Sequence, residues 1–184
     1  MEDLYDDLYF MRRAIEEAKI AFQKDEVPVG AVIVSNNQII ARAHNLTETL
    51  NDVTAHAEMQ AITSAANYIG GKYLNDCTLY VTLEPCQMCA GALYWSQISK
   101  IVIGASDNHR GFRVMKTKIH PKTKIIDGIL SAESKELIDD FFKKKEDCNK
   151  KTPSILRVSN VRNKILLVDK CYVSRNSTFF TIFF

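Results

Sequence analysis

The 184-residue sequence has few residues that interrupt regular structure, with 7 glycines, 4 prolines and a single tryptophan. So little glycine and proline excludes a collagen-like chain. A content of 46% hydrophobic and 25% charged residues is typical of a folded globular protein rather than of a disordered one. No apolar run approaches the ~18 residues that a membrane span needs, so we expect no contact with a membrane.

The two ends of the chain differ in charge. The first ten residues, MEDLYDDLYF, lack the positive leader and apolar core of a secretory signal, so a cytoplasmic protein is expected. Residues 1–142 contain 14 Lys/Arg against 19 Asp/Glu, whereas residues 143–184 contain 10 against 3. The basic end indicates contact with a polyanion, and a merely solvated tail is the alternative.

Helices are predicted from apolar periodicity in four places. Apolar residues recur at steps of three and four through residues 4–22, which predicts an amphipathic helix lying on a core. The alanine-rich residues 54–67 predict a second helix, which Gly70-Gly71 would end. A third is predicted from Pro85 to Ser96, because proline is favoured in the first turn. Residues 131–145 complete the set.

Strands are predicted where aliphatic and β-branched residues run together. Asn36-Asn37 predicts a tight turn between the first two strands, because asparagine tolerates positive φ. Residues 106–123 are expected to form a loop. The alternation of helices and strands predicts a layered α/β domain with a central sheet. The predicted strands are residues 29–34, 38–43, 77–83, 100–105 and 124–126.

The chain is expected to form one domain, residues 1–149, followed by a basic C-terminal extension, residues 150–184. The extension is basic and β-prone only in patches. We expect it to be poorly ordered or peripheral, and added edge strands or a partner-binding segment are the alternatives.

Three residues have the chemistry and spacing of a metal site. Cys86 and Cys89 are three residues apart at a predicted helix start, so their sulfurs share one face. The helix N-terminus favours the thiolates that bind metals. His56, at another helix start, adds a nitrogen, and this donor set suits zinc. Three protein ligands leave one tetrahedral position open, which is typical of a catalytic site.

Glu58 follows His56 by two residues. Residues at this spacing do not share a face of an ideal helix, so both can serve one pocket only if it lies at the helix end. There the carboxylate could take a proton from a metal-bound water and donate it to a substrate. The alternatives are a redox Cys-x-x-Cys pair, half of a structural zinc knuckle, or a chance His-x-Glu, and the joint occurrence of the motifs favours a zinc hydrolase.

The same segments carry a resemblance to a known family. They are EVPVGAV from Glu26, DVTAHAEM from Asp52 and TLYVTLEPCQMCAGAL from Thr78. Through them the chain resembles the cytidine-deaminase-like superfamily and, within it, the bacterial tRNA adenosine deaminases, over residues 1 to about 148. The resemblance implies a three-layer α/β/α fold with a central mixed five-stranded sheet, and a zinc-dependent deaminase domain.

The resemblance also implies roles for individual residues. One zinc ion per subunit would be held by His56, Cys86 and Cys89, and Glu58 would shuttle protons while adenosine is hydrolysed to inosine and ammonia. The family acts as a homodimer on the wobble adenosine of a tRNA anticodon loop. The residues implied in substrate binding are Val29, Asn45, Ala57, Asp107 and Phe142, with the Cys86 backbone. The chain departs from the family at Ser106, where the family usually has arginine.

The zinc site alone does not name the substrate, because enzymes of this fold also deaminate free guanine, free cytosine and nucleosides. Residues 108–126 contain six cations and no acid, which favours an RNA substrate because neutralising the backbone dominates affinity. Phe112 is expected either to stack on a base or to lie in the core. A non-catalytic, zinc-stabilised RNA-binding protein is a further alternative. The expected RNA backbone contacts are Arg110, Arg113, Lys116, Lys143 and Lys144.

Overall fold

The computed structural model describes residues 5–151, of which residues 5–141 and residues 142–151 belong to two separate units. The description of layers and packing below concerns the first unit. The elements are α1 (Asp7–Gln23), β1 (Gly30–Ser35), β2 (Gln38–His44), α2 (Ala57–Ile69), β3 (Cys77–Leu83), α3 (Gln87–Ser96), β4 (Lys100–Ala105), β5 (Lys124–Asp127) and α4 (Ser131–Lys151).

The strands form one five-stranded mixed sheet in the order β2-β1-β3-β4-β5. The first hairpin is antiparallel, and β1 also runs antiparallel to β3. The strands β3, β4 and β5 are parallel, and α3 makes the crossover from β3 to β4. The carboxyl ends of the parallel strands therefore lie at one edge, where α3 begins. The sheet is the mixed five-stranded one that the resemblance implied.

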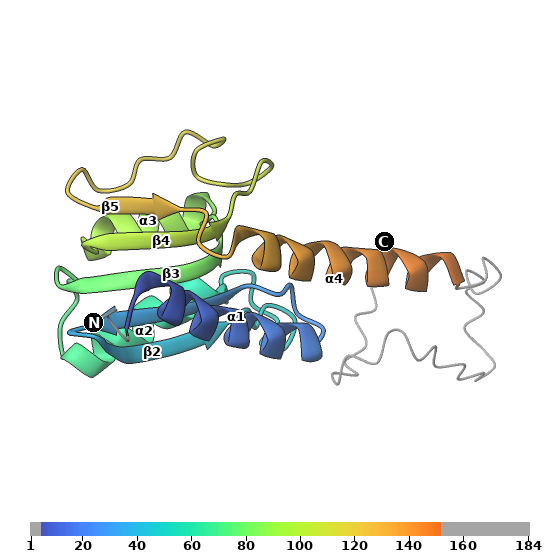
Figure 1. Ribbon diagram of the computed structural model, residues 1–184, viewed down its shortest axis with the longest axis horizontal. Helices are drawn as coiled ribbons and strands as arrows, with labels where there is room; N and C mark the ends of the chain where they lie inside the picture. Colours follow the sequence, from blue (N-terminus) through green and yellow to red (C-terminus); the bar gives the residue numbers. More distant parts are fainter. Residues whose placement is uncertain (1–4, 152–184) are drawn as a thin grey trace, which may run out of the picture. The chain divides into compact units, whose positions relative to one another are not determined.

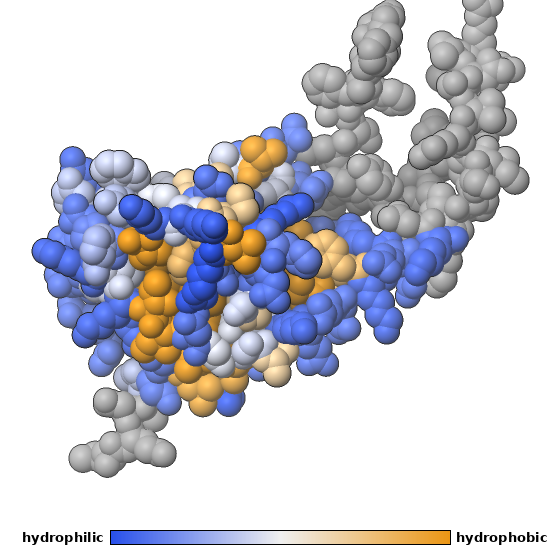
Figure 2. Space-filling model, turned by 90° about the horizontal axis from the view of Figure 1, so that it is seen from above, coloured by the Kyte–Doolittle hydropathy of each residue, from blue (hydrophilic) through white to orange (hydrophobic). Residues whose placement is uncertain are grey.

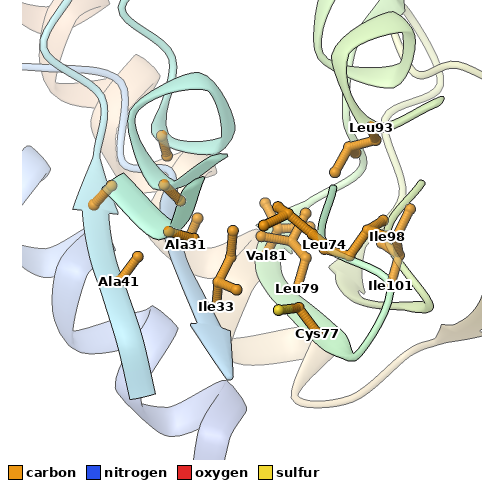
Figure 3. Packing of buried hydrophobic residues seen from close by; sticks show 14 of the residues in the cluster. Ala31, Ile33, Ala41, Leu74, Cys77, Leu79, Val81, Leu93, Ile98 and Ile101 are labelled. Carbon is orange, nitrogen blue, oxygen red and sulfur yellow. The ribbon is translucent and has the colours of Figure 1, made fainter. Parts of the chain in front are cut away.

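Helices cover both faces of this sheet, with α1 on one face and α2 and α3 on the other (Figure 1). Between the sheet and α1 lies a cluster that includes Met11 and Ile15 and also Leu137 from the first turns of α4. Between the sheet and the other two helices lies a larger cluster, in which Leu79 and Val81 of β3 approach Leu93 of α3 (Figure 3). The three-layer α/β/α architecture is confirmed.

Local chemistry explains where several elements begin or end. Asp6 accepts a hydrogen bond from the Tyr9 amide at 2.7 Å and caps α1. Asn36 and Asn37 both have positive φ, 49° and 58°, which gives the predicted tight turn. Gly70 ends α2 in the left-handed conformation with φ 71°.

Three predicted helix boundaries were wrong by a few residues. The second and third helices begin later than predicted, because His56 and Cys86 have extended backbones and stand as N-caps. Pro85 therefore precedes the N-cap of α3 instead of occupying its first turn. The helix α4 continues to Lys151, beyond the predicted end at residue 145.

The sheet ends in β5, an edge strand whose residues are all exposed. Figure 2 looks down onto this side of the molecule and shows apolar side chains gathered among charged ones. Val114, Met115, Ile125 and Ile126 are among the exposed apolar residues of β5 and the preceding loop.

None of the helices in the described part of the chain has the length and apolar character to cross a membrane. Residues 152–184, most of the predicted extension, lie outside the described residues. The predicted boundary at residue 149 and the character of the extension therefore stay predictions.

Gly30→Ala should destabilise the protein, because α1 packs directly on the β1 backbone. A Cβ at Gly30 would lie 2.0 Å from the Ala14 carbonyl oxygen and 2.4 Å from the Ala18 nitrogen. We expect a loss of about 2 kcal/mol or more in the free energy of unfolding, measured by urea denaturation. Gly71→Ala is the control, since its Cβ would meet only Ile69 at 4.0 Å. Equal stability of both variants would contradict this packing.

Candidate functional site

Two helix N-termini bring the predicted metal ligands together. His56 is the N-cap of α2, Cys86 is the N-cap of α3, and Cys89 lies in the first turn of α3. The Nδ1 atom of His56 lies 3.6 Å from the Cys86 sulfur and 3.5 Å from the Cys89 sulfur. The donor atoms of all three residues lie within 4.8 Å of one another. Sequence spacing alone could not bring His56 to the cysteines, which lie 30 residues further along the chain.

The charge state of the cluster suits a cation. Hydrogen bonding from Cys89, together with His56, outweighs burial and lowers the pKa of Cys86 to about 4, so this sulfur is a thiolate at neutral pH. The hydrogen bond to Cys86 and burial both raise the pKa of Cys89. A bound cation would displace the proton of Cys89, because a coordinating thiol is deprotonated.

The donor set fits zinc. Two soft sulfurs and one imidazole nitrogen are ligands that zinc prefers, and three ligands leave one tetrahedral position for water. Structural zinc sites are usually closed by four protein ligands. Within the described residues, His56, Cys86 and Cys89 are the group that could hold a metal. This cluster is therefore an open, catalytic type of zinc site.

Glu58 lies beside the three candidate metal ligands, in the first turn of α2, and is only 3% exposed. Burial raises the pKa of its carboxyl group to about 7. A group that titrates near neutral pH can both accept and donate a proton during turnover. The N-cap position of His56, outside the helix, allows the i, i+2 pair to serve one pocket, as the sequence predicted.

Three of the expected substrate-binding residues form one hydrogen-bonded group beside His56. The backbone amide of Asn45 donates to the Val29 carbonyl at 3.1 Å. The backbone amide of Ala57 donates to the side-chain oxygen Oδ1 of Asn45 at 2.8 Å. Both Val29 and Asn45 are buried at 6% exposure. The Ala57 amide uses the acceptor Oδ1, whereas both side-chain donors of Asn45 are on its NH₂ group, which this bond does not use.

Asp107 and Phe142, the other two expected substrate contacts, are placed differently. The Asp107 carboxylate accepts hydrogen bonds from the amides of His109 at 2.8 Å and Arg110 at 3.0 Å, so it shapes its own turn. Phe142 is half exposed and belongs to the second unit with Lys143 and Lys144. Their binding roles stay predictions.

The residues of the loop between β4 and β5 that the sequence suggested as RNA contacts differ in their surroundings. Arg110 and Lys116 are exposed. The guanidinium of Arg113 is paired with Asp127 and Glu84. Phe112 is only 5% exposed and lies in the larger core cluster, which settles the choice between core and base stacking in favour of the core.

A cavity of about 610 Å³ opens beside the candidate ligand Cys86, between α3 and the loop that joins β4 to β5. The lining of the cavity is mostly apolar and includes one charged side chain, that of Arg110. Its lining residues are Cys86, Gln87, Met88, Gly91, Arg110 and Met115.

Sequence reasoning missed two buried acids, Glu26 and Glu84, of which Glu84 lies two residues before the ligand Cys86. Glu26 is fully buried and accepts hydrogen bonds from the Thr47 hydroxyl and from the amides of Glu48 and Thr49. Burial opposes ionisation, but the hydrogen bonds outweigh it and lower the pKa of Glu26. Glu84 is 4% exposed and directly precedes Pro85. Both acids lie within the segments that carry the family resemblance, Glu26 in EVPVGAV and Glu84 in TLYVTLEPCQMCAGAL. Their place in these segments was the signal that could have identified them.

Comparison with known proteins agrees with this geometry. Residues 4–105 match the family described as the cytidine and deoxycytidylate deaminase zinc-binding region. The chain is 46% identical to the tRNA-specific adenosine deaminase of Aquifex aeolicus over 74% of its own length and 93% of the relative. It is 44% identical to the tRNA-specific adenosine deaminase of Bacillus subtilis, over 75% of its own length and 89% of that relative.

A solved structure shows the same fold and relationship. It comes from studies of A-to-I editing by tRNA:A34 deaminases at the wobble position, and it covers 70% of this chain and 98% of its own. It is 41% identical and superposes with a TM-score of 0.66. The chain therefore belongs to the cytidine and deoxycytidylate deaminase family of zinc-binding proteins, where it groups with the tRNA-specific adenosine deaminases.

Proposed function

We propose that this protein hydrolyses the wobble adenosine of a tRNA anticodon loop to inosine and ammonia. The observation that carries the proposal is an open His-Cys-Cys site with a buried carboxyl group, Glu58, beside it. A structural zinc site has no use for such a carboxyl group, which argues against a non-catalytic binding protein. The names of the similar proteins supply the choice of substrate. Because the proposed substrate is tRNA, we also propose a cytoplasmic location.

The chain's own residues supply binding and proton transfer. His56, Cys86 and Cys89 would hold zinc, which would supply a water molecule whose pKa is lowered to about 7. Glu58 accepts a proton at its carboxylate and later donates it toward the departing amino group, which leaves as ammonia. Asn45, oriented by Ala57, offers its NH₂ donors to acceptor atoms of the base.

The cations of the loop and of the second unit favour RNA over a free base. Arg110 and Lys116 are exposed, as are Lys143 and Lys144 in the second unit. A free base carries no phosphate, whereas an RNA loop gains affinity when cations neutralise its backbone. Asp107 and Phe142 are proposed to contact the nucleotide and the loop, as the family resemblance implies.

We further propose that the protein acts as a homodimer. Met88, Gly91 and Trp95 form a stripe along α3 at helical spacing, and the cavity lining places Met115 of the loop beside the first two. Trp95 is 76% exposed, and Val114 and Met115 are about half exposed. An exposed apolar surface of this kind is typical of a protein interface, and a second copy of the chain can offer the same surface in return.

The substrate is tested by comparing an anticodon stem-loop carrying a wobble adenosine with guanine, cytosine and free nucleosides. We expect inosine and ammonia from the RNA, and a kcat/KM that falls as salt rises because cations contact the backbone. Mass spectrometry of the digested RNA and an ammonia assay measure the products. Faster turnover of a free base than of the RNA would overturn the proposal, and no ammonia from any substrate would favour the binding protein.

Glu58→Gln and Cys86→Ala should separate catalysis from metal binding. Glu58→Gln removes the proton carrier but no ligand, so it should keep zinc and lose at least about 10²-fold in kcat. Cys86→Ala removes a ligand and should lose zinc and activity together. Elemental analysis and steady-state kinetics measure both effects.

Cys77→Ala is the matched control, because this buried thiol lies outside the cluster and should leave zinc content unchanged. Near-normal activity of Glu58→Gln would refute the assigned proton transfer.

Trp95→Glu should dissociate the homodimer, because it places a charge on the exposed apolar stripe of α3. Sedimentation velocity at micromolar concentration should show monomers for this variant and dimers for the unchanged protein. Tyr68→Glu is the control, since Tyr68 is 60% exposed on α2 outside the stripe. Dimers of the Trp95→Glu protein would show that α3 does not form the interface.

A further inference from the structure

Glu84 ties the loop after β4 to the segment that carries the metal ligands. It follows the last residue of β3 and precedes Pro85 and Cys86. Its side chain is 3% exposed. Its Oε1 accepts a hydrogen bond from the Arg113 amide at 3.1 Å, and its Oε2 accepts one from the Asp107 amide at 3.4 Å. One buried carboxylate therefore binds two points of the loop that are six residues apart.

The Arg113 side chain joins this carboxylate to a third segment. Its Nη1 lies 3.3 Å from Glu84 Oε2, and its Nη2 donates to both carboxylate oxygens of Asp127 at 2.7 and 2.9 Å. Asp127 is the last residue of β5. The guanidinium also lies 4.8 Å from the ring centroid of the buried Phe112. Arg113 thus bridges the ends of β3 and β5 with the planar fork that lysine lacks.

The loop lies tightly against the metal-binding segment at this point. Gly111 forms an isolated antiparallel bridge with the ligand Cys86, and the Phe112 amide donates to the Pro85 carbonyl at 2.9 Å. A Cβ at Gly111 would lie 2.6 Å from the Glu84 carboxyl carbon. A shift of the Glu84–Arg113–Asp127 network would therefore move the loop relative to the metal ligand.

We propose that Arg113 is a positioning residue, which orients residues 107–113 beside the metal site for an RNA substrate, and is not itself a phosphate contact. The proposal rests on the proposed function. The sequence suggested that Arg113 contacts the RNA backbone. We instead assign it a positioning role, because its guanidinium already pairs with the carboxylates of Glu84 and Asp127. The exposed pair with Asp127 alone would matter little. The bridge matters because Glu84 is buried, and without the guanidinium its carboxylate would keep only the two loop amides as partners.

Two substitutions distinguish a bridge from a phosphate contact. Arg113→Lys keeps the charge, so a phosphate contact would be largely preserved, whereas a bridge would be lost. Asp127→Asn removes an acid and frees Arg113, so a phosphate contact would lower KM for RNA, whereas a bridge would raise it. We expect both variants to raise KM for the anticodon stem-loop about tenfold with kcat within about twofold, because the loop and not Glu58 is displaced.

Arg42→Lys is the matched control. Arg42 lies in β2, outside the proposed RNA-binding residues, and its exposed side chain pairs with the exposed Glu16 at 3.9 Å, so KM should change by less than about twofold. A fall in KM for Asp127→Asn, or equal small effects of Arg113→Lys and Arg42→Lys, would overturn the proposal.

Hydrogen exchange on the zinc-loaded protein without RNA gives a readout that does not depend on the proposed function. The amides of residues 107–113 should exchange faster in Arg113→Lys and Asp127→Asn than in the unchanged protein, while Arg42→Lys should match it. Unchanged exchange in both variants would overturn the bridge. Faster exchange with no turnover of RNA by the unchanged protein would refute the proposed substrate and uphold the positioning of the loop.

Discussion

The structure depends on the meeting of two helix N-termini at one edge of the sheet. The caps of α2 and α3 are the ligands His56 and Cys86, and their donor atoms lie 3.6 Å apart. Hydrogen bonding from Cys89 and His56 lowers the pKa of Cys86 to about 4, and the partial positive charge of a helix N-terminus also favours a thiolate. The sheet holds these ends in place because β3 leads directly into α3, and the larger core cluster lies beneath both helices.

Three buried acids, Glu26, Glu58 and Glu84, differ in how their charge is compensated. Glu26 and Glu84 accept hydrogen bonds from loop amides, so each compensates its burial by holding a loop. Burial dominates at Glu58 and raises its pKa to about 7. The protein therefore uses the same chemical group for two purposes, and the local supply of N–H donors decides which carboxyl group orders a loop and which can carry a proton.

Fold and metal ligands alone do not distinguish the substrates of this family. Discrimination must come from the residues around the metal, and in this chain they fall into two sets. Val29, Asn45 and Ala57 form a rigid, hydrogen-bonded group beside the ligand His56. The loop after β4 carries the exposed cations and is held by side chains at the ends of β3 and β5. The first set suits recognition of a base and the second suits a phosphate backbone.

The sequence by itself determined what depends on neighbours along the chain. Periodicity indicated the helices, Asn36-Asn37 indicated the turn, and the Cys-x-x-Cys spacing indicated a metal site. Helix ends were less accurate, because caps are set by backbone conformation, and the extended backbone of His56 does not follow from its sequence.

Only the tertiary structure decided the contacts between distant residues. It placed Phe112 in the core and paired Arg113 with Glu84 and Asp127, which are 29 and 14 residues away. A run of cations in the sequence could not show which one is already neutralised. The physical reason is that the parallel order of β3, β4 and β5 brings these segments together, and strand pairing depends on the packing of the whole sheet.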